Sequence, residues 1–251
     1  MRNPFRRKNK PYAMQNTVNP PKKPIVQLLL AILTVVVVFF IYSLLQGIGL
    51  INKTQPTLFT MISTILIVLF FVLVYWWVNK RQRNISSVQP ASPSKGIKIA
   101  VTSTVVILIL QIILGNIQNL ILGETDVSAN QKAIEDMIQN PDTFLFIVVS
   151  TLIAAPLMEE LLFRRILIGK VPPIKTKMFY FRVVLAIITF AGMHVITELV
   201  NGINLEGLFA IGTFLIISSI ITFVYVRTGS IWYSMLAHFL NNSVAVIGML
   251  T

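Results

Sequence analysis

Long apolar runs alternate with short polar segments along the chain, and the length of these runs predicts membrane-spanning helices. A helix needs about 20 apolar residues to cross a hydrocarbon core of about 30 Å. Four runs reach this length without an interior charge; they cover residues 24–53, 54–79, 99–123 and 207–226. Three more apolar segments contain polar side chains; they cover residues 144–168, 179–200 and 231–250. The pattern predicts an all-α, polytopic transmembrane helical bundle of about seven spans.

The composition agrees with a membrane protein and excludes several kinds of active site. Of the 251 residues, 55% are apolar and 12% are charged, about half the charged share of a soluble domain. Cysteine is absent, which excludes disulfides, thiolate nucleophiles, iron–sulfur clusters and cysteine-bound zinc. The net charge of +12 would favour nucleic acid if a folded basic face lay outside the bilayer. No such face is predicted, so no nucleic acid partner is expected.

The basic residues instead predict how the bundle is oriented. With the N-terminus inside, 19 of the 21 Lys and Arg residues fall on the cytoplasmic side. This side comprises residues 1–23, 80–98, 164–182 and Arg227. Such an excess of Lys and Arg on one side obeys the positive-inside rule. We therefore expect a cytoplasmic N-terminus, with residues 1–23 as a basic tail against the anionic headgroups of the lipid bilayer.

Two acidic residues lie inside a predicted span, where an ionisable side chain is costly unless it is paired or wetted. They are the adjacent Glu159 and Glu160. Glu160 and Arg164 have the i, i+4 spacing of one helix face, so we expect a charge pair that offsets the burial of both groups. Glu159 lacks that partner and is available as a general base. A competing interpretation is that both acids cap a cytoplasmic helix end beside Arg164 and Arg165.

The two histidines of the chain both fall in apolar segments. His238 is followed at i+4 by Asn242, so the imidazole and the carboxamide project from one helix face. Phe190 and His194 have the same spacing, which places an aromatic ring beside the second imidazole. Each histidine taken alone is also compatible with a hydrogen-bonded packing residue. Together, a glutamate, two histidines and an asparagine on three helices are typical of water activation and oxyanion stabilisation.

Three motifs carry a resemblance to a known family. In chain order they are Glu159-Glu160-x-x-x-Arg164, Phe190-x-x-x-His194 and His238-x-x-x-Asn242. Their order and spacing resemble the signature of the CPBP family, the CAAX prenyl proteases and bacteriocin-processing membrane proteases, also called the Abi family. The resemblance covers roughly residues 144–251. It implies a catalytic four-helix core at 144–251, preceded by the tail at 1–23 and, at 24–143, by three N-terminal helices with an outer amphipathic loop.

The resemblance implies an intramembrane endopeptidase that acts on a membrane-associated peptide or protein. Glu159, assisted by His194, would deprotonate the attacking water, while His238 and Asn242 would donate hydrogen bonds to the oxyanion. Family substrates include the C-terminal tripeptides of prenylated proteins, bacteriocins and pheromones, and self-immunity is a further family role. The residues do not distinguish among these substrates, and they carry no signature of an oligomeric state.

Two alternatives stay open. One carboxylate and two imidazoles, here Glu159, His194 and His238, also form the ligand set of a catalytic zinc site. The chain lacks an H-E-x-x-H motif, and such a zinc would leave the already paired Glu160 as the base, so a mechanism without a cofactor is favoured. A non-enzymatic transporter or immunity scaffold would also bury such groups. The repeats and broken helices typical of transporters are not visible in the sequence.

The depths of Glu159 and His194 along their helices give one prediction about access and one inconsistency. At 1.5 Å per residue, Glu159 lies about 13 Å from the cytoplasmic end of its span at Ile168. Access is therefore expected from the cytoplasmic leaflet, and the short loops and missing eukaryotic signals favour a bacterial plasma membrane. His194 lies about 18 Å beyond Arg182, several ångströms deeper than Glu159. A tilt, a bend near Gly192 or a cytoplasmic extension of that helix is needed to bring the groups together.

Overall fold

Proline residues mark the starts of most of the long helices. In the computed structural model, which describes residues 23–50, 56–123 and 128–250, each of four helices begins at a proline. These helices are α1 (Pro24–Ile48), α2 (Pro56–Arg81), α3 (Pro93–Leu122) and α5 (Pro141–Val149). Proline suits the first turn because the amide hydrogen that it lacks would have no partner there within the helix. The breaks between apolar runs thus become the starts of helices.

The fourth apolar segment forms one long span with irregular winding. α5 continues into a π-helical turn, η1 (Ser150–Ala154), then into α6 (Ala155–Glu159) and a second π-helical stretch, η2 (Glu160–Ile168). The span ends at Gly169, whose φ of 84° favours glycine. The amphipathic helix expected in the outer loop is α4 (Ala129–Gln139), capped by the Ser128 side chain, which accepts from the Gln131 backbone N–H.

The last part of the chain contributes four helices. They are α7 (Lys177–His194), the short α8 (Ile196–Asn201), α9 (Leu205–Thr228) and α10 (Ile231–Leu250). The Thr176 side chain caps α7 and the Asn204 side chain caps α9, each by accepting a backbone N–H of the first turn. Gly229, in the left-handed conformation, ends α9 and lets the chain turn directly into α10.

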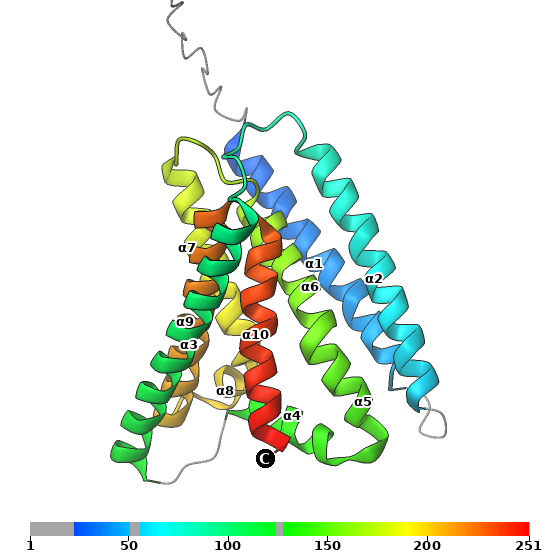
Figure 1. Cartoon of the computed structure of the whole chain (residues 1–251), viewed down its shortest axis with the longest axis vertical. Coiled ribbons are helices and arrows are strands. Elements are labelled where there is room, and N and C mark those ends of the chain that lie inside the picture. Colours follow the sequence, from blue (N-terminus) through cyan, green and yellow to red (C-terminus); the bar gives the residue numbers. More distant parts are fainter. Residues whose placement is uncertain (1–22, 51–55, 124–127, 251) are drawn as a thin grey trace, which may run out of the picture.

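The predicted all-α bundle is confirmed. Among the described residues, six helices are long and apolar enough to cross a membrane: α1, α2, α3, the α5–η2 span, α7 and α9. α10 has 20 residues, but His238, Asn241 and Asn242 lower its mean hydropathy. It lies within the bundle beside the others (Figure 1), so the expected number of about seven spans agrees approximately with the structure.

Helices from both parts of the chain pack together. α3 packs against α9 and α10, α1 packs against α2 and η2, and α2 packs against α5. Gly96 on α3 permits a close approach to α10, because a Cβ atom there would lie 2.2 Å from the ring of Tyr233. In Figure 1, α1 and α2 lie together on one side of the bundle, and α3 lies beside α9 and α10.

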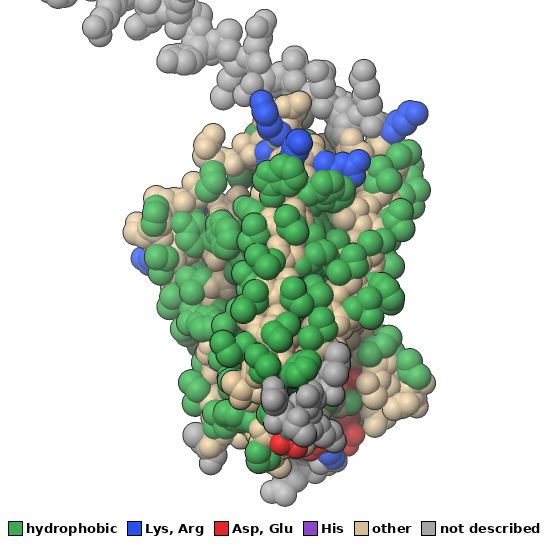
Figure 2. Space-filling model, turned by 90° about the vertical axis from the view of Figure 1, so that its right-hand side faces the viewer, with side chains coloured by type: hydrophobic (Ala, Val, Ile, Leu, Met, Phe, Trp, Pro, Cys, Tyr) green, Lys and Arg blue, Asp and Glu red, His purple; other side chains and the backbone are tan. Residues whose placement is uncertain are grey.

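The charged side chains separate toward opposite ends of the bundle. Figure 2 shows an apolar side surface with Lys and Arg gathered at one end and Asp and Glu at the other. The α2–α3 loop, the α7 start and the α9–α10 turn share the first end, which we call the basic end; the α4–α5 connection and the α8–α9 turn share the other, the acidic end (Figure 1). These features and the apolar spans describe an integral membrane protein. The basic tail, except for Lys23, lies outside the described residues.

Two predicted segment boundaries were wrong. α3 begins at Pro93, six residues before the apolar run at 99, because the charges of Lys95 and Lys98 do not interrupt a helix that extends beyond the hydrocarbon. The segment 179–200 is not one span, since α7 ends at His194 and α8 follows after Val195. α7 also begins at Lys177, five residues before Arg182, which is the extension expected for His194 to reach the depth of Glu159.

Candidate active site

The irregular winding of the fourth span surrounds its glutamate pair. Ala155 donates its backbone N–H to the Ser150 carbonyl five residues earlier, as in a π-helix. The next donor in that pattern would be Pro156, which has no amide hydrogen. Glu159 closes α6 and Glu160 opens η2, so both carboxylates sit where the winding changes. Single π-helical turns inside α-helices occur frequently at functional sites.

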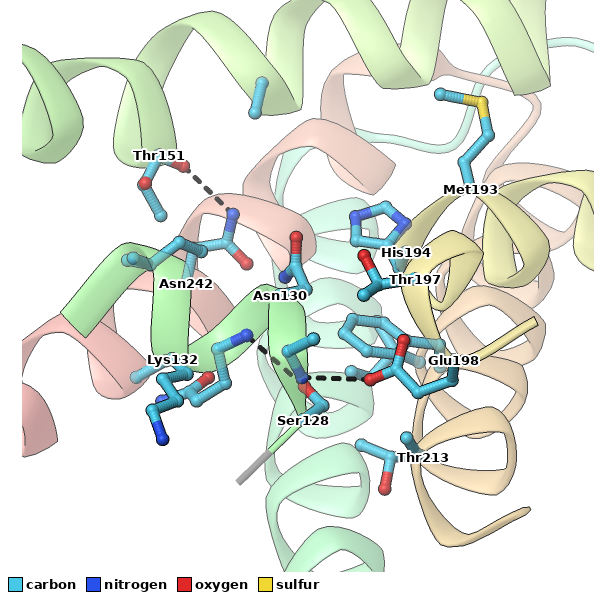
Figure 3. A pocket seen from close by; sticks show the side chains of 18 of the residues that line it. Ser128, Asn130, Lys132, Thr151, Met193, His194, Thr197, Glu198, Thr213 and Asn242 are labelled. Atoms are coloured by element: carbon cyan, nitrogen blue, oxygen red, sulfur yellow. Dashed lines mark hydrogen bonds between the residues drawn. The ribbon is translucent and has the colours of Figure 1, made fainter. Parts of the chain in front are cut away.

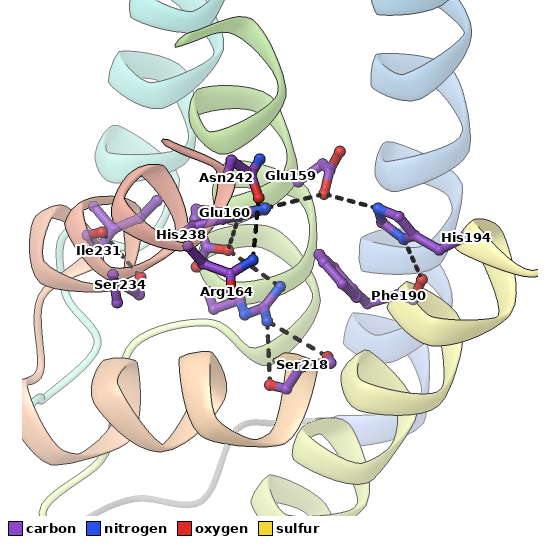
Figure 4. Close-up of polar contacts among 12 residues, drawn as sticks. Glu159, Glu160, Arg164, Phe190, His194, Ser218, Ile231, Ser234, His238 and Asn242 are labelled. Carbon is purple, nitrogen blue, oxygen red and sulfur yellow. Dashed lines mark hydrogen bonds and ion pairs between the residues drawn. The ribbon is translucent and has the colours of Figure 1, made fainter. Parts of the chain in front are cut away.

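Glu159 and both histidines converge on one point, as predicted. The Glu159 Oε2 atom lies 3.7 Å from His194 Nε2 and 3.9 Å from His238 Nε2, and Figure 4 shows the three side chains facing one another. Glu159 Oε2 is buried and has no hydrogen-bond partner within the protein. Its side chain is 15% exposed, whereas that of Glu160 is fully buried. Of the two carboxylates, Glu159 is therefore the one that a small molecule can reach.

Glu160 holds two partners at once. Its Oε1 atom lies 3.3 Å from Arg164 Nη1, which confirms the predicted pair, and 3.1 Å from His238 Nδ1. Arg164 is fully buried, and its Nη2 donates to the backbone carbonyl of Ser218 on α9 at 3.3 Å. Glu160 thus orients the imidazole of His238 in addition to balancing the guanidinium charge. The interpretation that the acids cap a helix end is wrong, because Glu160 and Arg164 lie in the interior.

His194 is held rigidly by its neighbours. Its Nδ1 atom lies 2.8 Å from the Phe190 carbonyl oxygen, which can only accept, so Nδ1 carries the hydrogen and Nε2 faces Glu159. The imidazole stacks between the rings of Phe190 and Phe214, with centroid separations of 4.4 and 4.7 Å. Phe190 also contacts the guanidinium of Arg164, whose carbon lies 4.8 Å from the ring centroid. Phe190 thus packs against the imidazole, as its spacing predicted, and its role as an orienting ring stays a prediction.

Asn242 lies in the wall of the site with its carboxamide already engaged. Its Nδ2 donates to the Thr151 carbonyl at 2.9 Å, and its Oδ1 accepts from Asn241 at 3.3 Å. A π-helical bond to the Thr151 carbonyl would have to come from Pro156, which cannot donate, and Asn242 supplies the donor instead. One hydrogen of Nδ2 remains for an oxyanion. Its catalytic assignment stays a prediction.

A polar cavity of about 870 Å³ leads to these groups. Glu159, His194, His238 and Asn242 all line it, together with residues from α1, α3, α4, α8 and α9. Figure 3 shows the side of the cavity bordered by α4 and α8. There the Ala129 backbone N–H donates to Glu198 Oε1 at 2.9 Å, which ties the first turn of α4 to α8. The cavity gives the buried groups a connection to solvent inside an apolar bundle.

The residues fit zinc by type and less well by spacing. Both Nε2 atoms are presented to Glu159, and both Nδ1 atoms have oxygen partners, as is usual for zinc-bound histidine. Ligands of one tetrahedral zinc lie roughly 3.3 Å apart, which is shorter than the two separations seen. Within the described ranges, no group of three or more His, Cys, Asp or Glu side chains has the arrangement of a metal site.

Comparison with known proteins bears on this arrangement. Residues 141–244 match the family model of the Rce1-like type II CAAX prenyl endopeptidases. The resemblance carried by the three motifs is confirmed, and the matched segment contains all seven predicted site residues. The match supports a membrane peptidase without defining the subtype.

A curated relative extends this similarity. Over 148 residues, 59% of the chain, the sequence is 31% identical to the Bacillus subtilis (strain 168) protein named "Putative membrane peptidase YdiL". The matched part covers 54% of that protein, so the chain spans about half the length of this curated relative. No solved structure matches the chain.

Sequence reasoning missed four contacts of the site. Ser218 anchors Arg164, Phe214 covers His194, Thr151 engages Asn242, and Asn241 bonds to Asn242. Phe214 and Ser218 share an i, i+4 face of α9, a signal that the sequence does contain. Such spacing is too common in apolar helices to single out these two residues without knowing which face of α9 meets α7 and η2.

Proposed function

We propose that this protein is an intramembrane endopeptidase that hydrolyses a peptide bond of a membrane-associated peptide or protein. The observation that carries the proposal is the meeting of Glu159 with His194 Nε2 and His238 Nε2 at the inner end of a polar cavity. General bases that act on water are commonly carboxylates or imidazoles held in such partly shielded sites. The CAAX-type and the bacteriocin- or pheromone-type substrates are the two candidate classes.

In the proposed reaction, one water donates to Glu159 Oε2 and to the unprotonated Nε2 of His194. Glu159 accepts a proton, the resulting hydroxide attacks the scissile carbonyl carbon, and the carbonyl oxygen becomes an oxyanion. Glu159 then returns the proton to the leaving amine as the C–N bond breaks. The products are a carboxylic acid and an amine, and the glutamate is regenerated.

His238 is placed to stabilise the oxyanion. Its Nδ1 atom lies 3.1 Å from Glu160 Oε1, and in this proposal its Nε2 atom donates to the oxyanion. Asn242 adds its second amide hydrogen in this proposal. Each donor of this kind contributes about 3 kcal/mol to transition-state stabilisation.

The test of the proposal is Glu159→Gln in the purified full-length chain, assayed with a library of membrane-anchored peptides. The substitution keeps the shape of the side chain but removes the base, so we expect cleavage to fall by at least 100-fold. Asp136→Asn on the exposed surface of α4 is the matched control and should cleave like the unaltered protein. Mass spectrometry in ¹⁸O-labelled water identifies the cleaved bond and the incorporated oxygen. Equal product formation by the Glu159→Gln variant would overturn the proposal. The grounds for preferring a peptidase to a transporter or a scaffold would then be lost as well.

Metal dependence is a separate prediction of the same mechanism. Because Glu159 and His194 activate the water themselves, we expect cleavage to survive exhaustive dialysis against 1,10-phenanthroline and EDTA. Elemental analysis of the active protein should then find far less than one zinc per chain. Activity that disappears on chelation and returns with zinc would instead establish Glu159, His194 and His238 as ligands.

A further inference from the structure

The lining of the active-site cavity comes from one end of the bundle. Beyond the site itself, most of its residues lie on α4, on α8, in the turn before α9, in the first half of α9 and in the second halves of α1, α3 and α10. These segments gather at the acidic end in Figure 1. Among the described residues, the cavity lining includes none from 79–98, 168–177 or 226–231, which form the basic end. The cavity therefore runs from Glu159 toward the acidic end.

The opposite side of the site is filled by packed side chains. Leu161, Leu162 and Phe163 follow the glutamate pair and are at most 1% exposed, and Arg164 is fully buried. A second, smaller cavity of about 240 Å³ lies at the basic end, beside Arg165 and Lys170. It shares no lining residue with the first cavity. The structure thus contains a polar route to Glu159 from the acidic end and a packed layer toward the basic end.

The charge distribution says which compartment the acidic end faces. Lys and Arg residues of the described chain concentrate at the basic end; they include Lys80, Arg81, Arg83, Lys95, Lys98, Lys170, Lys175, Lys177 and Arg227. Short loops rich in Lys and Arg stay in the cytoplasm. The acidic end carries Glu135, Asp136, Asp142, Glu198 and Glu206, which places it on the far side of the membrane.

The cavity is chemically suited to a peptide main chain. Ten carboxamide side chains line it: Gln46, Gln111, Gln118, Asn119, Asn130, Gln131, Asn201, Asn204, Asn241 and Asn242. Each carboxamide both donates and accepts, as do the peptide groups of an extended chain. Glu159, Glu198 and Glu206 also line the cavity, against a single lysine, Lys132, so neutral or basic segments are favoured over acidic ones.

We infer that the active site is reached from the extracytoplasmic side and that its substrate is a peptide segment exposed at the outer surface of the membrane. The nature of the substrate rests on the proposed peptidase function, whereas the route rests on the cavity and on the distribution of Lys and Arg. It replaces the expectation of cytoplasmic access, which was based on the depth of Glu159. A site deep in the cytoplasmic half and an entrance on the outer side are compatible, because the cavity joins them.

The absence of cysteine from the sequence makes the route directly testable. Single-cysteine variants of the full chain, produced in intact bacterial cells, are treated with a charged, membrane-impermeant methanethiosulfonate. Thiols left unblocked are then counted by a polyethylene-glycol maleimide gel shift after lysis. Asn201→Cys at the cavity mouth and Ala245→Cys farther in along α10 both line the cavity. Ser86→Cys is the control, because Ser86 lies exposed in the loop between α2 and α3 at the basic end.

We expect the reagent to block Asn201→Cys and Ala245→Cys in intact cells, and to block Ser86→Cys only after the membrane is permeabilised. The reverse pattern, with Ser86→Cys blocked in intact cells and the cavity cysteines protected until permeabilisation, would overturn the inference. So would blocking of Asn201→Cys without Ala245→Cys, since the cavity would then not continue inward. The labelling needs no turnover and is repeated with Glu159→Gln in the same chain, so failure of the route and failure of the peptidase function give different results.

Discussion

At the scale of single residues, the charged side chains of the site are stabilised by partners that are themselves buried in the bundle. Glu160 shares one oxygen between Arg164 and His238, and Arg164 reaches across to Ser218 on α9. A guanidinium inside an apolar bundle requires such partners, because an unpaired buried charge costs several kcal/mol. The same contacts fix the imidazole that faces Glu159, so the stability of the bundle and, in the proposed mechanism, its chemistry both depend on the Glu160 carboxylate.

This coupling predicts the behaviour of Glu160→Gln. The variant leaves Arg164 buried without a counter-charge, and we expect a loss of about 3–5 kcal/mol in the free energy of unfolding. Cleavage should fall as well, because His238 loses its charged partner. Adding Arg164→Met should restore much of the stability without restoring turnover. Thermal unfolding in detergent and kcat for the single and double variants measure both effects; a Glu160→Gln protein with unaltered stability and kcat would contradict the assignment.

The sequence predicted the residues of the site better than their contacts. Glu159, Glu160, His194 and His238 stand out because an ionisable group in an apolar span needs a reason to be there. The stacking of His194 between Phe190 and Phe214, and the bond from Asn242 to Thr151, depend on which helix faces meet. Almost every face of these helices is apolar, so periodicity cannot choose between a face toward lipid and a face toward the bundle.

At the scale of elements, the fourth span is shaped by a proline and completed by another helix. Pro156 cannot donate to the Thr151 carbonyl, and Asn242 of α10 donates to it instead. The span was predicted as one helix because the segment 144–168 is long and mainly apolar, although it contains Glu159, Glu160, Arg164 and Arg165. Its π-helical winding was not predictable, since it depends on a partner that lies about 90 residues away in the sequence. The break after His194 was missed in a similar way, because the segment 179–200 is mainly apolar on both sides of it.

A double-mutant cycle separates the structural and catalytic roles of Asn242. Asn242→Ala leaves the Thr151 carbonyl without its donor and should lower stability by about 1–3 kcal/mol. Pro156→Ala supplies a backbone donor, so in that background the same change should cost less stability, with a coupling of about 0.5–3 kcal/mol. If Asn242 also serves the oxyanion, turnover of the double variant stays low after stability returns. Unfolding and kcat of the four proteins give the answer, and purely additive stabilities would remove the proposed link between the two residues.

At the scale of the whole molecule, basic and acidic side chains lie at opposite ends of the bundle, and so do the packed layer and the cavity. Lys and Arg gather at the basic end, beyond the packed layer next to the site, while the cavity and its carboxamide side chains lie toward the acidic end. In the inference drawn above, the basic end faces the cytoplasm and the acidic end carries the entrance. The sequence predicts the orientation, because topology follows from Lys and Arg counts. It could not establish the entrance, because a cavity depends on how helix ends from α3, α4, α8, α9 and α10 come together.

The charge of the lining makes a prediction about substrates. Three glutamates and one lysine line the cavity. A peptide with Lys near the scissile bond should therefore have a KM about 1.4- to fivefold lower than its Glu counterpart, in line with about 0.2–1 kcal/mol for a partly exposed ion pair. The difference should shrink as ionic strength rises, because salt screens charges near the mouth. Glu206→Gln, at the mouth, should reduce the preference while leaving kcat for a neutral peptide similar. Matched fluorogenic peptides at low and high salt measure these values. A lower KM for the acidic peptide would show that the lining carboxylates do not govern which segments enter.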